Sequence, residues 1–286
     1  MRPDLISFFT AMFFALACAA ETGTPLKESY KDLIAVAQNK SLAKDRLPAT
    51  QTLILALKKE KSLVARKELL SALTDLSEVF YSDKAQQLFE LGESLRFDSP
   101  QTALEKYGEA LKLEPGNVSI LRGIGRAQLA LGTCEKVSDV AQQAMEMNPF
   151  ADDLQLLRAQ ALSCLVRTKD SRAVIEKIDT RKSPLKIYFE VVKIQNLVFE
   201  DKFGLAEEEL KKLIDADPKF PEGYYWMAQV KTRQKIEATE WNQKYVRLCQ
   251  AITSAQRRKY GPEPRLCSER KNVELALEQA QSGENS

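Results

Sequence analysis

Histidine is absent from all 286 residues of this chain. Without it the chain has no Ser-His-Asp or Cys-His arrangement to activate a nucleophile, and it lacks the commonest general base and zinc ligand. Ser41 and Lys44 form an S-x-x-K sequence, but the S-D-N and K-T-G companions of that acyl-enzyme motif are missing. Gly123 and Gly125 lack the third glycine of a dinucleotide-binding loop. We therefore expect a protein that is not an enzyme and binds no cofactor or metal ion.

The chain also lacks a net charge that would attract nucleic acid, because 42 basic residues face 40 acidic ones. The basic run at 257–259 is typical of a solvated helix face. No apolar stretch beyond the first twenty residues is long enough to span a membrane. The predicted partners are other proteins or peptides, and no nucleic acid.

The first twenty residues combine Arg2 with an apolar stretch at 5–17 and a run of small residues that ends at Ala20. This pattern predicts a secretory signal peptide. The sequence ALAC at 15–18 is also similar to a bacterial lipobox, in which the cysteine becomes the lipidated first residue. Two alternatives stay open: cleavage after Ala20, or a lipid anchor at Cys18 that would be the sole attachment to a membrane. Either one predicts an exported protein, periplasmic or associated with the outer membrane.

Four prolines recur at nearly constant spacing, with intervals of 34, 35 and 34 residues between Pro115, Pro149, Pro184 and Pro218. Each ends an apolar-periodic segment, as in EALKLEP and KLIDADP, where the proline ring cannot continue a helix. A fixed period of this size indicates stacked helix-turn-helix repeats.

The residues between the prolines resemble the tetratricopeptide repeat, whose two helices carry a Leu-Gly signature and an Ala-aromatic-Ala-Pro signature. The best copy pairs Gly92 in its first helix with Tyr107 in its second, and later copies are weaker. The resemblance covers roughly residues 84 to 248. Small residues expected where the two helices of a unit cross are Gly92, Gly125, Ala159 and Ala228.

This resemblance implies an all-α fold, a right-handed superhelical solenoid of antiparallel helix pairs. Three apolar-periodic stretches precede the repeats, and residues 49–82 are consistent with a degenerate repeat. Two helices, at 238–259 and 264–281, are expected to close the stack. The expected division is a signal peptide at 1–20, an N-terminal helical segment at 21–82, repeats at 83–237, capping helices at 238–281 and a disordered tail at 282–286.

Four cysteines follow Cys18, and an even number in an exported protein indicates disulfides. Repeat geometry places Cys134 at the start of one second helix and Cys164 near the end of the next first helix, at the same edge. Cys249 and Cys267 are separated by a helix end and a turn. We expect bonds between Cys134 and Cys164 and between Cys249 and Cys267, with four buried free thiols as the alternative.

Proteins of the resembled family hold an extended peptide or a partner helix in an inner groove lined by the first helix of each unit. The resemblance thus implies a non-enzymatic scaffold or adaptor in the bacterial cell envelope. The alternative is a chaperone-like or substrate-presenting subunit in a secretory compartment, where Asn117 would be a glycosylation acceptor.

Projecting the first-helix register onto this sequence gives the predicted partner-binding residues. Arg122 and Arg126 lie one helical turn apart and are expected to bind a partner carboxylate without contributing to folding. The predicted groove residues are Phe89, Glu93, Arg96, Arg122, Arg126, Leu156, Gln160, Val191, Gln195, Tyr225, Gln229 and Arg233.

Overall fold

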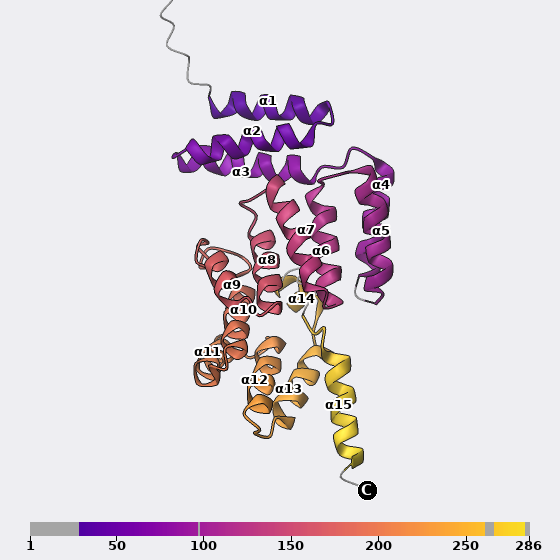
Figure 1. Cartoon of the computed structure of the whole chain (residues 1–286), viewed down its shortest axis with the longest axis vertical. Coiled ribbons are helices and arrows are strands. Elements are labelled where there is room, and N and C mark those ends of the chain that lie inside the picture. The colour runs from indigo at the N-terminus through magenta and orange to yellow at the C-terminus, as the bar shows by residue number, and fades with distance from the viewer. Residues whose placement is uncertain (1–28, 97, 261–265, 284–286) are drawn as a thin grey trace, which may run out of the picture.

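The computed structural model describes residues 29–96, 98–260 and 266–283, which form helices and no strand (Figure 1). The signal peptide, Cys18 and the two cleavage alternatives lie outside the described residues. Within those ranges no helix has both the length and the apolar character to cross a membrane. The helices are α1 Tyr30–Leu42, α2 Arg46–Lys59, α3 Leu63–Glu78, α4 Asp83–Leu95, α5 Pro100–Leu113, α6 Val118–Ala130, α7 Cys134–Met147, α8 Asp152–Cys164, α9 Thr168–Ile175, α10 Lys186–Phe199, α11 Phe203–Ala216, α12 Pro221–Arg233, α13 Thr239–Gln250, α14 Ser254–Tyr260 and α15 Arg270–Gly283.

From α4 to α13 the helices pack in consecutive pairs, and each second helix also contacts the first helix of the following pair. The first helices α4, α6, α8, α10 and α12 form a layer of their own, because each of them contacts the next. This arrangement is the helical solenoid that the proline period predicts. The layer of first helices is the surface on which the predicted groove residues lie.

Three of the four prolines mark helix ends as predicted. Pro115, Pro149 and Pro218 each stand two residues beyond the end of a 14-residue second helix. Pro184 differs, because α9 has 8 residues and ends at Ile175. The chain then runs through turns from 176 to 185 before α10 begins.

Gly92 and Gly125 lie at close helix contacts, as the repeat pattern predicts. A Cβ atom on Gly92 would stand 2.5 Å from Cε1 of Tyr107, and one on Gly125 would stand 2.5 Å from Cδ2 of Leu157. Tyr107 is fully buried, so its ring has no room to move away. Glycine at these two positions is therefore what allows the helices to approach.

The three helices α1–α3, here called the N-terminal unit, run across the ends of α6 and α7 in Figure 1. Helix α3 packs on α6, and α2 packs on α7. A degenerate repeat would instead stack ahead of α4 with its helices in the direction of the solenoid. The unit therefore covers the proline-containing edge of the first two repeats.

Long-range polar contacts hold the N-terminal unit to that edge. Arg46 forms a buried ion pair with Glu114, with 2.6 Å between Nη2 and Oε2. Asn117, at the start of α6, donates from Nδ2 to the carbonyl oxygens of Glu78 and Val79. Asn148 donates to the hydroxyl of Thr74. Glu114 and Asn117 flank Pro115, and Asn148 precedes Pro149. The proline turns therefore bind the N-terminal unit as well as ending helices.

The C-terminal region contains three helices where two were expected. The segment predicted as one helix at 238–259 divides at 251–253 into α13, which packs on α12, and α14. Tyr260, at the end of α14, packs against Phe220 with ring centroids 5.1 Å apart. Helix α15 then packs on α13 and continues to Gly283, two residues into the predicted disordered tail.

Candidate functional site

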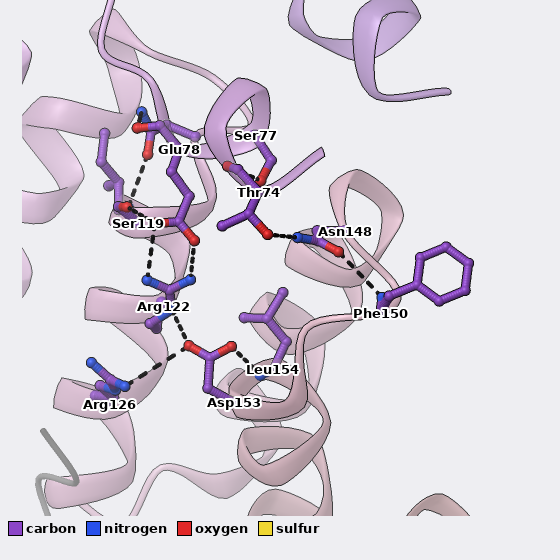
Figure 2. A network of polar contacts seen from close by, with 12 residues as sticks. Thr74, Ser77, Glu78, Ser119, Arg122, Arg126, Asn148, Phe150, Asp153 and Leu154 are labelled. Carbon is purple, nitrogen blue, oxygen red and sulfur yellow. Dashed lines mark hydrogen bonds and ion pairs between the residues drawn. The ribbon is translucent and has the colours of Figure 1, made fainter. Parts of the chain in front are cut away.

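The N-terminal half of the first-helix layer carries a network of ion pairs, which Figure 2 shows around Arg122. Arg122 on α6 lies between two carboxylates from different elements, Glu78 of α3 and Asp153 of α8. Its Nη2 is 2.5 Å from Oε1 of Glu78, and its Nε is 2.5 Å from Oδ2 of Asp153. Arg126 approaches the same Asp153 oxygen at 4.0 Å. We call these residues, with Glu93 and Arg96 of α4, the ion-pair network.

The position of Arg122 corrects the prediction that it does not contribute to folding, and its role in partner binding stays a prediction. Its side chain is 17 % exposed and joins the N-terminal unit to α6 and α8. Burial lowers the pKa of the guanidinium, but Asp153 and then Glu78 outweigh that effect, so the pKa is raised. Arg122 therefore contributes to the stability of the fold, because reversing its charge would leave the carboxylates of Glu78 and Asp153 without their cation.

Three other predicted residues lie around the ring of Tyr107. Glu93 accepts a hydrogen bond from the Tyr107 hydroxyl at 2.6 Å and lies 3.3 Å from Arg96. Phe89 packs on the Tyr107 ring, with centroids 5.8 Å apart. Burial, followed by the bond to Glu93, raises the pKa of Tyr107, which therefore stays neutral. Glu93 and Phe89 thus contact the buried ring of Tyr107 directly, and Arg96 is linked to it through Glu93.

The C-terminal half of the same layer of first helices contains a cavity. A cavity of about 190 Å³ lies between α8, α10, α12 and the segment that precedes α15. Four predicted groove residues, Gln160, Val191, Gln195 and Tyr225, line it together. We call it the glutamine cavity; its other lining residues are Tyr188, Val192, Glu222, Trp226, Ser268 and Glu269.

Two buried amides in the glutamine cavity have no hydrogen-bond partner among the described residues. Gln160 of α8 is 5 % exposed and Gln195 of α10 is 4 % exposed, and both side chains line the cavity. Neither amide contributes a fully buried polar atom, so the N–H donors and oxygen acceptors of both side chains are accessible from the cavity. The two glutamines therefore present hydrogen-bonding groups to the cavity without a protein partner in the described ranges.

The wall opposite these amides is acidic and aromatic. Glu222 of α12 is 6 % exposed, and its Oε1 accepts the backbone N–H of Cys267 at 2.7 Å. Glu269 completes the acidic side, and its own backbone N–H donates to the hydroxyl of Tyr245. No lysine or arginine of the described residues lines the cavity. Among the described lining residues the two charged ones, Glu222 and Glu269, are both acidic.

Leu156, another predicted groove residue, is 2 % exposed and belongs to the apolar core. Two further predicted residues lie along α12. Gln229 is half-buried, one turn beyond Tyr225. Arg233 is exposed and lies over the ring of Phe199, with 5.5 Å from Cζ to the ring centroid. Neither residue lines the glutamine cavity. The predicted groove residues therefore do not form one continuous site.

Two pairs of cysteines lie at disulfide distance, and they are the pairs that repeat geometry predicts. The Cα atoms of Cys134 and Cys164 are 6.0 Å apart, and those of Cys249 and Cys267 are 5.6 Å apart, both within the range of disulfides. Cys267 immediately precedes Ser268 and Glu269, so a bond to Cys249 of α13 would hold the segment that forms one wall of the glutamine cavity.

A second and larger hollow, of about 560 Å³, lies between α10, α11 and Tyr260 of α14. Its apolar floor includes Ile187, Ile194 and Leu213, and Pro184 stands in its wall. Sequence reasoning missed this outer cavity. Most of its lining residues come from α10, α11 and α14, and no motif in the sequence groups them.

The structure also bears on the glycosylation site, metal binding and the S-x-x-K sequence considered above. Asn117 is fully buried, and its side chain is hydrogen-bonded to α3, so the folded protein offers no acceptor for glycosylation. Across the described ranges no group of three or more potential metal-ligating side chains occurs. Ser41 of the S-x-x-K sequence is hydrogen-bonded to the hydroxyl of Tyr81.

Comparison with known proteins gives only structural likenesses. No family model and no curated protein matches the chain. Among solved structures, the type IV pilus biogenesis factor PilW has a TM-score of 0.49 at 19 % identity, covering 69 % of this chain and 94 % of its own. A thermophilic TPR protein of Thermus thermophilus, TTC0263, has a TM-score of 0.47 at 16 % identity, with 67 % and 99 % covered. A tetratricopeptide repeat protein of Parabacteroides merdae has a TM-score of 0.44 at 18 % identity, with 88 % and 92 % covered. Likeness at this level carries no argument about function, and the assignment of a helical solenoid rests on the helix packing described above.

Proposed function

We propose that this protein is a non-enzymatic adaptor that binds an extended peptide or a helix of a partner protein on its layer of first helices, at the glutamine cavity. The observation that carries the proposal is the pair of unpartnered amides, Gln160 and Gln195, on consecutive first helices. The N-terminal half of the layer supports the same site by contrast, because its polar groups are occupied by the ion-pair network.

The chemistry of the two amides suits a peptide. Each carboxamide offers N–H donors and a carbonyl acceptor, which are the complements of a backbone C=O and N–H. Each such bond that a peptide makes would contribute about 0.5–1.5 kcal/mol to binding. The rings of Tyr225 and Trp226 supply apolar contact area beside the amides, and such residues commonly anchor interfaces.

We also propose that the adaptor acts in the bacterial cell envelope. The predicted signal peptide and the lipobox-like sequence at 15–18 support export. Two cysteine pairs at disulfide distance suit an oxidising compartment.

The test is a selection of linear peptides from a random display library on the full chain, followed by titration of the selected peptides. The variant Gln160→Leu with Gln195→Leu keeps the side-chain volume and removes both amides. We expect peptide affinity to fall at least tenfold, because two hydrogen bonds are lost and the peptide groups that made them stay unpaired.

The matched control is Gln142→Leu with Gln143→Leu, which makes the same chemical change on the exposed side of α7. Full affinity is expected for this control. Equal affinity of the cavity variant and the control would contradict the proposed site, and a selection that yields no binding peptide would contradict the proposed function.

A further inference from the structure

The end of the N-terminal unit at which α2 passes into α3 carries an excess of positive charge. Residues 55–67 contain four lysines and one arginine but a single acidic residue, whereas basic and acidic residues are nearly balanced over the whole chain. We call residues 55–67 the basic tip. Its lysines are all exposed and form no ion pair among the described residues; they are Lys58, Lys59, Lys61 and Lys67.

Other charged groups at this end take part in contacts within the fold. Arg66 donates from Nη1 to two carbonyl oxygens at the end of α2. Glu60 accepts the backbone N–H groups of the two residues that follow it. Glu68 accepts a hydrogen bond from the Tyr30 hydroxyl, and Asp32 belongs to the capping box of α1. The exposed lysines are therefore the charges of this end that stay available to a partner.

Apolar side chains stand among these lysines. Leu63 is 84 % exposed, Val64 67 % and Leu55 57 %. Helical spacing places Leu55 on the same face of α2 as Lys58, and Leu63 on the same face of α3 as Lys67. Single exposed apolar residues are common, but here three of them lie within ten residues. Segments that lie at a membrane surface combine apolar side chains with lysines in this way.

The basic tip lies beside the start of α1. Tyr30, the first residue of α1, is bonded to Glu68 near the start of α3, with 3.3 Å between the two oxygens. Cys18 precedes Ser29 by 11 residues, a distance of at most about 40 Å when extended. Residues 21–28 contain two acidic side chains and one basic, so the positive excess of this end persists. An acyl chain at Cys18 would hold the basic tip close to a bilayer.

We propose that the basic tip binds the surface of a bilayer that contains anionic phospholipid, with its lysines at the headgroups and Leu63 and Val64 at the boundary of the acyl chains. This contact goes beyond the adaptor function and would add to any lipid anchor at Cys18. Nucleic acid would also attract the lysines, but it offers no apolar phase for the leucine and the valine. The N-terminal unit stands at the opposite end of the molecule from α12 and α13, so the glutamine cavity would remain accessible (Figure 1).

Sedimentation with lipid vesicles tests the proposal on residues 21–286, which carry no acyl chain and contain every helix of the structure. We expect at least tenfold stronger partition into vesicles of phosphatidylglycerol with phosphatidylcholine than into phosphatidylcholine alone. Each lysine near an anionic surface is worth about fivefold in affinity, and added salt should weaken the binding by screening. Equal binding to both vesicles would overturn the proposal. Binding to neither would also overturn it, including the case in which the basic tip binds nucleic acid instead.

Two lysine variants with the same change in net charge locate the contact. The tip variant replaces three lysines by glutamine: Lys58, Lys59 and Lys61. The control variant replaces three exposed lysines of α4, α7 and α9 by glutamine: Lys84, Lys136 and Lys169. We expect the tip variant to lose at least tenfold in partition into the anionic vesicles and the control to keep full binding. Equal losses would show that net charge alone attracts the vesicles, which overturns the proposal.

Fluorescence tests the insertion of the apolar side chains. The emission of Leu63→Trp should move to shorter wavelength when anionic vesicles are added, because the indole enters an apolar environment. Leu42→Trp is the control, since Leu42 is 82 % exposed at the opposite end of α1 from Tyr30, and its emission should not move. Equal shifts in the two variants, or no shift in Leu63→Trp, would overturn the proposal.

Failure of this inference is separable from failure of the proposed function. The tip variant should bind the selected peptides with unchanged affinity, because the basic tip and the glutamine cavity share no residue. The variant Gln160→Leu with Gln195→Leu should likewise keep its partition into anionic vesicles. Loss of vesicle binding in that glutamine variant would overturn the assignment of the membrane contact to the basic tip.

Discussion

The two halves of the first-helix layer use their polar side chains in opposite ways. In the N-terminal half, arginines and carboxylates of α3, α4, α6 and α8 pair with one another. In the C-terminal half, two buried amides on α8 and α10 pair with nothing in the described structure. The first half is thereby fixed to the N-terminal unit, and the second half keeps its hydrogen-bonding groups available for a ligand.

The comparison teaches that residue type does not tell whether a polar side chain is available to a partner. Arginine is enriched in interfaces, and this made Arg122 and Arg126 the boldest prediction for the groove. Both have intramolecular acidic neighbours, and the residues left available are glutamines. What distinguishes the two halves is whether each buried polar group already has a partner.

The largest effect on stability should come from Arg122→Glu. Breaking a mostly buried ion pair and placing a third carboxylate beside Glu78 and Asp153 should lower the free energy of unfolding by about 3–5 kcal/mol. Urea titration followed by circular dichroism measures the change. Arg167→Glu is the control, since Arg167 is 57 % exposed and its pair with Asp170 is worth less than about 1 kcal/mol. An equal decrease in the free energy of unfolding in the two variants would contradict the structural role of the ion-pair network.

Removal of either disulfide should follow in magnitude. Bonds that close loops of 30 and 18 residues stabilise by roughly 3 to 4 kcal/mol in the chain-entropy model. Mass spectrometry of exported protein without reduction should find Cys134 linked to Cys164 and Cys249 linked to Cys267. Four alkylated thiols under those conditions would contradict both bonds and the envelope location that they support.

A smaller loss is expected where the fully buried ring of Tyr107 meets α4. Gly92→Ala should lower the free energy of unfolding by roughly 1 to 3 kcal/mol, because the new Cβ would overlap the ring. Gly108→Ala on α5 is the matched control: a Cβ there meets nothing within 4 Å, and alanine favours the helix by about 0.5–1 kcal/mol. Thermal unfolding of the two variants should shift in opposite directions, and shifts in the same direction would contradict the close contact.

The smallest effect on stability should come from the residues with the largest effect on binding. Gln160→Leu with Gln195→Leu removes two amides that have no partner among the described residues, so the free energy of unfolding should change by less than about 1 kcal/mol. A fall comparable to that of the Arg122 variant would show that the amides have structural partners, and the contrast between the two halves would disappear.

Much of the fold was predictable because its signals are local. The prolines at 115, 149 and 218 lie two residues beyond helix ends, and Gly92 and Tyr107 meet as the repeat pattern requires. The three helices before the repeats were also predicted. Cysteine pairing followed from where Cys134 and Cys164 fall on adjacent helices.

The predictions that failed depend on residues far apart in the sequence. Arg122 pairs with Glu78 and Asp153, 44 and 31 positions away, and no periodicity reports such pairs. The crossing of the N-terminal unit over the proline turns depends likewise on Arg46 and Glu114, which are 68 positions apart. Gln160 and Gln195 were named from the repeat register, but their burial without partners is a property of the packed structure.

A crystal structure of the full chain with a selected peptide tests the central claim most directly. We predict hydrogen bonds from the side chains of Gln160 and Gln195 to the peptide, with the peptide lying over the glutamine cavity. A peptide bound instead in the outer cavity between α10 and α11, with both amides unchanged, would contradict the account.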